Sequence, residues 1–162
     1  MIDSGGMKTE ATIRWMTAAR ADADAPGLRA LMNDLAAFEG WPDLLSVTAA
    51  EIARRAQAVP PGLQAVLAEA DGGLVGFATV FPIPYAYAAR PSLELEMLYV
   101  AEPWRARGVG RALMDAVLNH ARAGGFERVE WNVLATNARA QAFYESLGGA
   151  EKAGWRRWGV TL

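Results

Sequence analysis

Residues 93–116 read LELEMLYVAEPWRARGVGRALMDA, and this stretch determines which fold the chain can adopt. Leu93–Val100 is a continuous apolar and β-rich run with a proline beyond each end, which predicts a strand. Gly108–Arg122 carries apolar side chains at helical spacing, which predicts a helix. A short basic loop, residues 101–107, joins the two, so the stretch predicts a strand–loop–helix unit.

The junction of this loop and helix has the pattern Arg105-x-x-Gly108-x-Gly110. Glycines lack a Cβ atom, so a ligand can come close to the main chain. The first amides of a helix have no partner within it and carry the positive end of its dipole, which favours an anion. The pattern alone is equally compatible with a tight turn, and it matches neither the dinucleotide fingerprint nor the Walker P-loop. The residues that would form a phosphate or pyrophosphate seat are Arg105, Ala106, Arg107, Gly108, Val109, Gly110 and Arg111.

The composition excludes several classes of protein. At 162 residues, with 52% hydrophobic and 21% charged residues, the chain has the size and balance of one globular domain. A net charge of −2 gives no reason to expect a nucleic-acid partner. The absence of cysteine and the single histidine predict no disulfide, no cysteine nucleophile and no metal site. No apolar run approaches the roughly 20 residues that span a membrane, so we expect a cytoplasmic protein with no membrane partner.

The rest of the chain predicts further strands and helices in one domain, residues 9–162, after a disordered Met1–Lys8 in which Met7 is an alternative start. A capping box at Thr48 and Glu51 begins one of the helices, and Asp71-Gly72-Gly73 makes a hairpin turn. The expected strands are Thr12–Met16, Leu63–Ala70, Leu74–Phe81, Arg128–Leu134 and Trp155–Leu162; the expected helices are Leu28–Phe38 behind Pro26, one ending before Pro60, and Asn137–Ser146; Pro82–Pro91 is expected to be a loop.

This β-α-α-β-β-β-α-β-α-β order, with Arg105-x-x-Gly108-x-Gly110 between strand and helix, resembles the GNAT superfamily of acyl-CoA N-acyltransferases. A second block, WNVLATNARAQAFYESLG at residues 131–148, is similar to the second cofactor motif of that family. The resemblance covers Thr12–Leu162 and implies an α/β fold, a mixed central sheet with helices on both faces and a splayed strand pair that holds the acyl-CoA. Segments such as LAAFE at residues 35–39 are similar to the diamine (spermidine/spermine) acetyltransferase branch.

The resemblance also implies acetyl-CoA as the cosubstrate and assigns residues to it. Backbone groups of Leu98, Tyr99 and Val100 would bind the pantetheine arm, and an amide there would stabilise a tetrahedral oxyanion. The second motif would contribute Asn137, Ala140, Phe143 and Tyr144. Asn137 would bind the pantetheine or the tyrosine, and asparagine is also a common helix N-cap, so both roles stand.

Tyr144 is the candidate general acid, because it matches the tyrosine of the family. A phenol with a pKa of about 10 can protonate a departing thiolate whose parent thiol has a pKa of about 8.5. A tyrosine that only packs beside Phe143 is the structural alternative. His120 lies near the end of the predicted helix, where a cation favours the dipole, and we expect a structural role for it.

Three carboxylates are candidates for the acceptor side of the reaction. Glu96 lies among apolar residues of the predicted strand, where a carboxylate needs a partner or water, so we expect either a base acting through water or the counter-ion of an amine. Glu94 shares its face by strand periodicity and would be the solvated one. Glu39 matches an acceptor-site acid of the diamine branch, or is a surface charge. Trp41, Tyr85 and Tyr87 could line an acceptor pocket.

Two departures from the diamine branch bear on the substrate. Met97 and Ala153 stand where that branch carries acidic residues, and a site with fewer carboxylates should hold a less cationic substrate. The sequence therefore predicts direct acetyl transfer to a small primary amine, in a protein that is a homodimer if it follows the habit of the family. The alternatives are an aminoglycoside or protein N-terminal acetyltransferase, and a non-catalytic acyl-CoA-binding module.

Overall fold

The structure is a computed structural model that describes residues 10–84, 90–152 and 160. The chain forms two compact units, residues 1–131 and residues 132–162, and each is described by itself. Met1–Lys8, Tyr85 and Tyr87 lie outside the described residues, as does nearly all of the strand expected at Trp155–Leu162.

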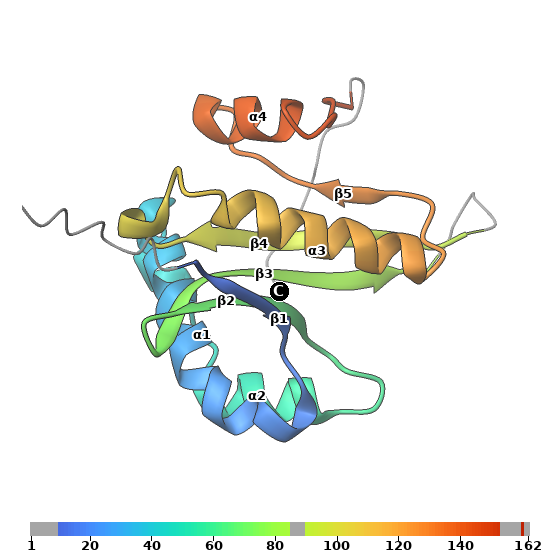
Figure 1. The fold of residues 1–162 in the computed structure, drawn as a ribbon. Helices are drawn as coiled ribbons and strands as arrows, with labels where there is room; N and C mark the ends of the chain where they lie inside the picture. The colour runs from blue at the N-terminus through green and yellow to red at the C-terminus, as the bar shows by residue number, and fades with distance from the viewer. Residues whose placement is uncertain (1–9, 85–89, 153–159, 161–162) are drawn as a thin grey trace, which may run out of the picture. The chain divides into compact units, whose positions relative to one another are not determined.

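The first unit is a mixed sheet with helices on both faces, as the sequence predicted (Figure 1). Its strands lie in the order β1-β2-β3-β4-β5, where β1 to β4 run antiparallel to their neighbours and β5 is parallel to β4. The strands are β1 Thr12–Trp15, β2 Gln64–Ala70, β3 Gly73–Ile83, β4 Ser92–Val100 and β5 Val129–Trp131. The helices are α1 Ala21–Phe38, α2 Ala49–Gln57 and α3 Val109–Ala123, with short 3₁₀ turns at Ala18–Arg20, Pro42–Leu44 and Glu102–Trp104.

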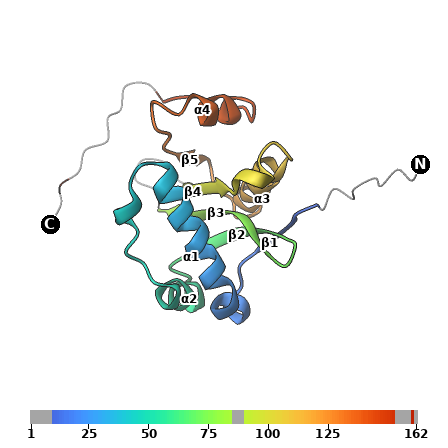
Figure 2. The same ribbon diagram turned by 90° about the vertical axis from the view of Figure 1, so that its left-hand side faces the viewer.

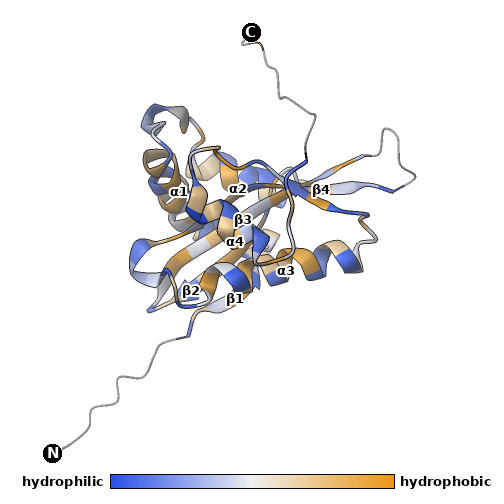
Figure 3. Cartoon of the chain, turned by 90° about the horizontal axis from the view of Figure 1, so that it is seen from above, coloured by the Kyte–Doolittle hydropathy of each residue, from blue (hydrophilic) through white to orange (hydrophobic). Residues whose placement is uncertain are grey.

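The helices α1 and α2 cover one face of the sheet and α3 covers the other (Figures 1 and 2). Phe77 of β3 is fully buried in the cluster that α1 and α2 build on the first face. The neighbouring Gly76 faces α3, where an added Cβ would meet Leu113 Cδ1 at 3.3 Å and Tyr99 O at 3.0 Å. Polar and apolar residues alternate along α3, whose buried side is formed by Val109, Leu113, Met114, Val117 and Ala121 (Figure 3).

A buried ion pair fixes the start of α1. Arg14 of β1 donates two hydrogen bonds of 2.8 Å to the carboxylate of Asp24, which is only 5% exposed. Its Nε also donates to Glu69 of β2 at 2.8 Å. The expected helix start near Pro26 is therefore wrong: α1 begins at Ala21, and Pro26 lies inside it.

Two other predicted boundaries change. The strand β3 continues to Ile83, so the expected loop at Pro82–Pro91 begins later, because Pro82 and Ile83 still pair with β4. The fifth strand is Val129–Trp131 rather than Arg128–Leu134, since its ladder with β4 ends at Leu95 and Trp131. The ring of His120 lies 4.6 Å from that of Trp15 and 6.2 Å from that of Phe126, a structural role through ring contacts, whereas the expectation rested on the helix dipole.

The second unit contains one described helix, α4 Ala138–Glu145. Asn137 caps its first turn by accepting from Ala140 N at 3.1 Å. Gln141 ties the helix to the preceding segment through the carbonyl oxygens of Leu134 and Ala135. In the part of the chain that the structure describes, none of the helices has the length and apolar character needed to cross a membrane.

Candidate active site

The loop between β4 and α3 presents a row of backbone amides. Gly108 is the N-cap of α3 and has a left-handed backbone with φ 85°. Ala106 is also left-handed, with φ 59°. The first helical bond runs from Ala112 N to Gly108 O at 2.9 Å. Among the described residues, no backbone acceptor is bound by the amides from Ala106 to Arg111, which leaves them available to an anion.

A β-bulge interrupts β4 just before this loop. Leu95 pairs with Val80 and Met97 pairs with Thr79, so Glu96 is an extra residue without a partner in β3. The pairing of β4 with β5 covers only Leu93–Leu95. From Glu96 to Val100, no other described strand pairs with the outer edge of β4, which is the splayed arrangement that the resemblance implied.

The backbone groups of β4 divide between its two sides. Ala101 N donates to Val75 O of β3 at 2.9 Å. Since backbone groups of successive strand residues point to alternate sides, those of Tyr99 face β3, whereas those of Leu98 and Val100 face the open edge. Leu98 N–H, Leu98 C=O and Val100 N–H are therefore directed to where an extended amide-bearing chain would lie. The backbone of Tyr99 is not.

The three arginines of the loop have different surroundings. The Arg105 guanidinium carbon lies 5.1 Å from the ring centroid of Phe38 and 5.4 Å from that of Tyr99. Its Nε donates to Val100 O at 2.9 Å. Arg107 lies over Trp104 at 5.1 Å, within its own loop, and Arg111 is 3.9 Å from Asp115. Arg107 and Arg111 remain exposed beside the amides, whereas Arg105 is half-buried and engaged with α1 and β4.

Two acidic side chains, Glu39 at the end of α1 and Glu96 of β4, are within electrostatic range of each other. Glu39 ends α1, where Gly40 N donates to Ala37 O at 3.1 Å and Trp41 N to Ala36 O at 2.8 Å. This Schellman end directs Glu39 and Trp41 away from the helix. Burial and the nearby charge of Glu96 both raise the pKa of the Glu39 carboxyl above its usual value. The Glu39 carboxyl therefore senses the negative charge of Glu96, the extra residue of the bulge.

The exposure of these residues differs in part from the expectation. Glu96 is exposed to water at the bulge, whereas Glu94 is half-buried, so Glu94 is not the solvated member of the two. The bulge is the reason, since Glu96 is itself the extra residue and has no partner in β3. Trp41 is 59% exposed and Phe38 57%, which leaves two aromatic rings at the surface next to Glu39.

The remaining candidates belong to the second unit. Tyr144 is half-buried on α4, with its ring 5.2 Å from that of Phe143. The carbonyl of Tyr144 accepts from Leu147 N and Gly149 N, both at 3.0 Å, which ends the helix. Asn137 is an N-cap, as its structural interpretation predicted, and Ala140 provides the amide that it caps.

Sequence reasoning missed Phe38 and Trp104, the aromatic partners of Arg105 and Arg107. In the sequence, Phe38 only ends the helix expected at Leu28–Phe38, and nothing in the spacing indicates a contact with Arg105. The signal that could have found it is its position in the last turn of α1, next to Glu39 and Gly40, where a helix leaves the core.

A sequence model described as the acetyltransferase (GNAT) family matches residues 28–149. The chain belongs to this family. The match includes the loop at Gly108, the bulged strand and α4, so both blocks singled out in the sequence lie within the family domain.

Curated relatives are acetyltransferases named for different substrates. An L-ornithine N5-acetyltransferase of Arabidopsis thaliana is 35% identical over 53% of this chain and 38% of its own. A mycothiol acetyltransferase of Thermobispora bispora is 36% identical over 78% of this chain and 41% of its own. A thialysine N-epsilon-acetyltransferase of Caenorhabditis elegans is 27% identical over 76% and 75%. The matched part thus spans well under half of the first two relatives.

Solved structures of GNAT acetyltransferases share the fold. An aminoglycoside acetyltransferase from an uncultured soil metagenomic sample superposes with a TM-score of 0.78 at 18% identity, covering 94% of this chain and 96% of its own. An aminoglycoside N-acetyltransferase in complex with CoA gives a TM-score of 0.74 at 22% identity, covering all of both chains. At these identities the likeness concerns the fold alone.

Proposed function

We propose that the protein is an acetyl-CoA-dependent N-acetyltransferase that acts on a small primary amine. The observation that carries this proposal is the pair of acidic side chains, Glu39 and Glu96, beside the bulge of the same strand whose open edge leads to the amide row at Gly108. A cationic acceptor suits the acidic pair, and a pyrophosphate suits the amides.

The residues of the chain would divide the work as follows. The amides from Arg107 to Arg111 hold the pyrophosphate, with Arg107 and Arg111 adding charge. Leu98 N–H, Leu98 C=O and Val100 N–H align the pantetheine arm along the open edge of β4. Bound acetyl-CoA supplies the thioester that the amine attacks. Holding both reactants in one place replaces a bimolecular encounter by a positioned one.

Proton transfer is assigned to two side chains. Glu96 accepts a proton from the amine through water, for which its exposure is suited, or remains its counter-ion. Tyr144 donates the proton of its hydroxyl to the departing thiolate. Asn137 orders the start of α4 through its cap and thereby supports the position of Tyr144.

The proposed acceptor is an amino-acid-like amine or a monoamine. Glu39 and Glu96 provide two carboxylates, while Met97 replaces a further acid of the diamine branch, so a polyamine would lack a counter-charge. The named activities of the ornithine and thialysine relatives support an amino-acid-like acceptor, since both are amino acids with a side-chain amine.

The test is release of free thiol from acetyl-CoA in the presence of L-ornithine, thialysine, spermidine or kanamycin. We expect turnover with one or both amino acids, little with spermidine, and a large rise in amine KM in Glu39→Gln and Glu96→Gln. Glu127→Gln, at an exposed carboxylate on the other end of the sheet, is the control and should leave KM unchanged. Exclusive turnover of kanamycin would overturn the proposed acceptor, and no turnover despite CoA binding would overturn the enzyme assignment.

Two further proposals concern the assembly of the protein and its location. We propose a homodimer, following the habit of the family, and a cytoplasmic location. Sedimentation of the purified chain over a tenfold concentration range tests the first; a mass of one chain throughout would rule it out.

A further inference from the structure

We propose that Arg105 is a positioning residue that fastens the acceptor-side end of α1 to the cofactor edge of β4, and that it is not a ligand of the cofactor phosphates. The inference rests on the proposed function for its link to the amine, whereas its structural part stands on the contacts of Arg105 alone.

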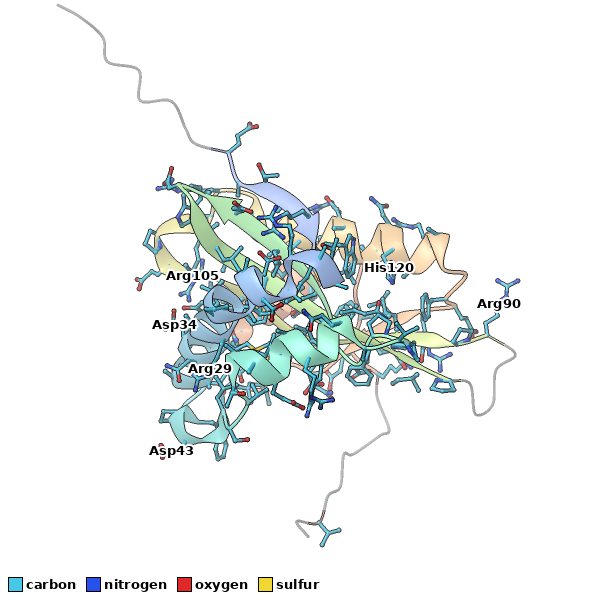
Figure 4. The ribbon with its side chains drawn as sticks, turned by 90° about the horizontal axis from the view of Figure 1, so that it is seen from below. Arg29, Asp34, Asp43, Arg90, Arg105 and His120 are labelled. Atoms are coloured by element: carbon cyan, nitrogen blue, oxygen red, sulfur yellow. The ribbon has the colours of Figure 1, made fainter. Side chains whose placement is uncertain are left out.

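The contacts of Arg105 point away from the amide row. Its Nε donates a hydrogen bond to Val100 O at 2.9 Å. Val100 is the last residue of β4, and its carbonyl group faces the open edge of that strand. Its guanidinium lies over two rings, 5.1 Å from Phe38 and 5.4 Å from Tyr99. In the view from below, Arg105 is labelled beside the end of α1 (Figure 4). A planar guanidinium stacks on aromatic faces while its N–H groups donate in plane, so both contacts form at once.

Phe38 has little else to hold it. The ring is 57% exposed and is not a member of the buried cluster between α1 and the sheet. The residue that follows it is Glu39, whose backbone is fixed by the bond from Glu39 N to Leu35 O at 2.9 Å. Phe38 and Glu39 are adjacent, so the contact of Arg105 with the Phe38 ring adds to the bonds that hold the segment carrying the acidic side chain.

Arg105 is also the first residue of the glycine pattern, three positions before the N-cap of α3. A pyrophosphate on the amides after it would order the loop backbone, and Arg105 would pass that order to Phe38 and Glu39. Two sites that share one ordered element influence each other reciprocally. Cofactor binding is thus expected to strengthen amine binding.

Arg107 provides a matched control. It is a cation of the same loop, two residues away, and it also lies over an aromatic ring at 5.1 Å, but that ring is Trp104 of the loop itself. Arg107 has the exposure that a phosphate ligand needs, and in the described part of the chain its aromatic contact stays within its own loop.

The first experiment compares Arg105→Met, Arg105→Lys, Phe38→Leu and Arg107→Met in CoA titration calorimetry and in steady-state kinetics with the best amine of the panel above. We expect Arg105→Met and Phe38→Leu each to raise the amine KM by about tenfold, with kcat little changed. The two effects on KM should not add in the double variant. Lysine should fail to restore KM, because it lacks the planar stack. Arg107→Met should instead weaken CoA.

Opposite results overturn the proposal. If Arg105→Met weakens CoA binding by about tenfold while Phe38→Leu does not, Arg105 is a phosphate ligand. The same holds if Arg105→Lys restores the wild-type KM, because lysine can act only as a point charge. Phe38→Leu removes no charge and keeps an apolar side chain, so it reports on the contact even if Arg105→Met fails to fold.

A second measurement needs no acceptor. Hydrogen exchange of the peptide that covers residues 36–41 should slow when CoA binds the wild type, and it should no longer respond in Arg105→Met saturated with CoA. Unchanged protection in the variant would overturn the inference. If no amine were acetylated but this loss were observed, the proposed function would fail while the fastening role of Arg105 stood.

Discussion

Single side chains carry the sharpest consequences for the chemistry. Tyr144→Phe keeps the ring that contacts Phe143 and removes only the hydroxyl. If that hydroxyl protonates the thiolate, kcat should fall by about 10²–10⁴-fold while the Kd for CoA stays constant. Stopped-flow thiol release and calorimetry measure the two quantities. A variant with wild-type kcat would return Tyr144 to a packing role.

The raised pKa of Glu39 predicts a pH dependence. Only the ionised carboxylate attracts an ammonium group, so amine affinity should be lost as pH falls through the raised pKa of Glu39. Removing the neighbouring charge in Glu96→Gln lowers that pKa, and the acidic limb of the profile of 1/KM should move to lower pH. An acidic limb that stays in place would show that Glu39 does not control it.

The same shift has a cost in stability. A carboxyl whose pKa is higher in the folded than in the unfolded state binds the proton more tightly when folded, so the folded chain loses stability as pH rises through this range. Glu39→Gln should therefore raise the melting temperature near pH 7 while weakening amine binding. A lower melting temperature would contradict the assignment of Glu39 as a binding group whose pKa is raised in the folded chain.

At the scale of elements, one ion pair fastens α1 to the sheet. Asp24 is buried and its pKa is lowered by hydrogen bonds from Arg14, so its contribution is present above the unfolded pKa and is lost as pH falls through the folded one. Asp24→Asn should destabilise the chain by about 3 kcal/mol in urea unfolding at pH 7. Glu51→Gln, on the surface of α2 with two arginine partners, is the exposed counterpart and should change little.

The loop that begins α3 allows a matched pair of glycine variants. Gly108 and Gly72 both have left-handed backbones, with φ of 85° and 77°, and no atom lies within 4 Å of an added Cβ in either. Alanine should cost about 1–2 kcal/mol of stability at each position. Only Gly108→Ala should also weaken CoA binding in calorimetry, because only Gly108 belongs to the amide row proposed to face the ligand. Equal CoA affinity in both variants would contradict the amide seat.

Local patterns predicted the elements well where the signal lies within one element. The capping box at Thr48 is present, with Glu51 N donating to Thr48 Oγ1 at 3.1 Å, and the hairpin, β4 and α3 lie where they were expected. The start of α1 was missed because it involves the ion pair of Asp24 with Arg14, which lies ten residues before Asp24 in another element. The bulge at Glu96 was missed because it is a property of two paired strands, and the strand periodicity gave no sign of it.

The candidate site shows the same division. The amide row at Gly108 follows from glycines and a helix start, which are adjacent in sequence. The electrostatic interaction of Glu39 with Glu96 could not be predicted from spacing, since the two residues are far apart in the chain. The engagement of Arg105 with Phe38 has the same origin: the residues are 67 positions apart and meet only through the packing of α1 on the sheet.

At the scale of the whole molecule, the sequence predicts one domain and the structure contains two compact units, so an experiment must ask whether both units bind the cofactor. If Asn137 and Tyr144 of the second unit bind the same acetyl-CoA as the amide row of the first, the ligand should stabilise both. Trypsin cleavage at the exposed Arg139 of α4 should then slow on addition of CoA, by up to about a hundredfold at 100 times Kd if opening of α4 releases the ligand.

The control for this cleavage lies in the first unit. Arg54 and Arg55 are exposed on α2, which carries none of the residues assigned to the cofactor, so local cleavage there should not respond to CoA. Slowing at Arg139 alone would join α4 to the cofactor site and with it the role of Tyr144. Cleavage at Arg139 that ignores CoA, while the melting temperature still rises, would place cofactor binding in the first unit only and would remove Asn137 and Tyr144 from the site.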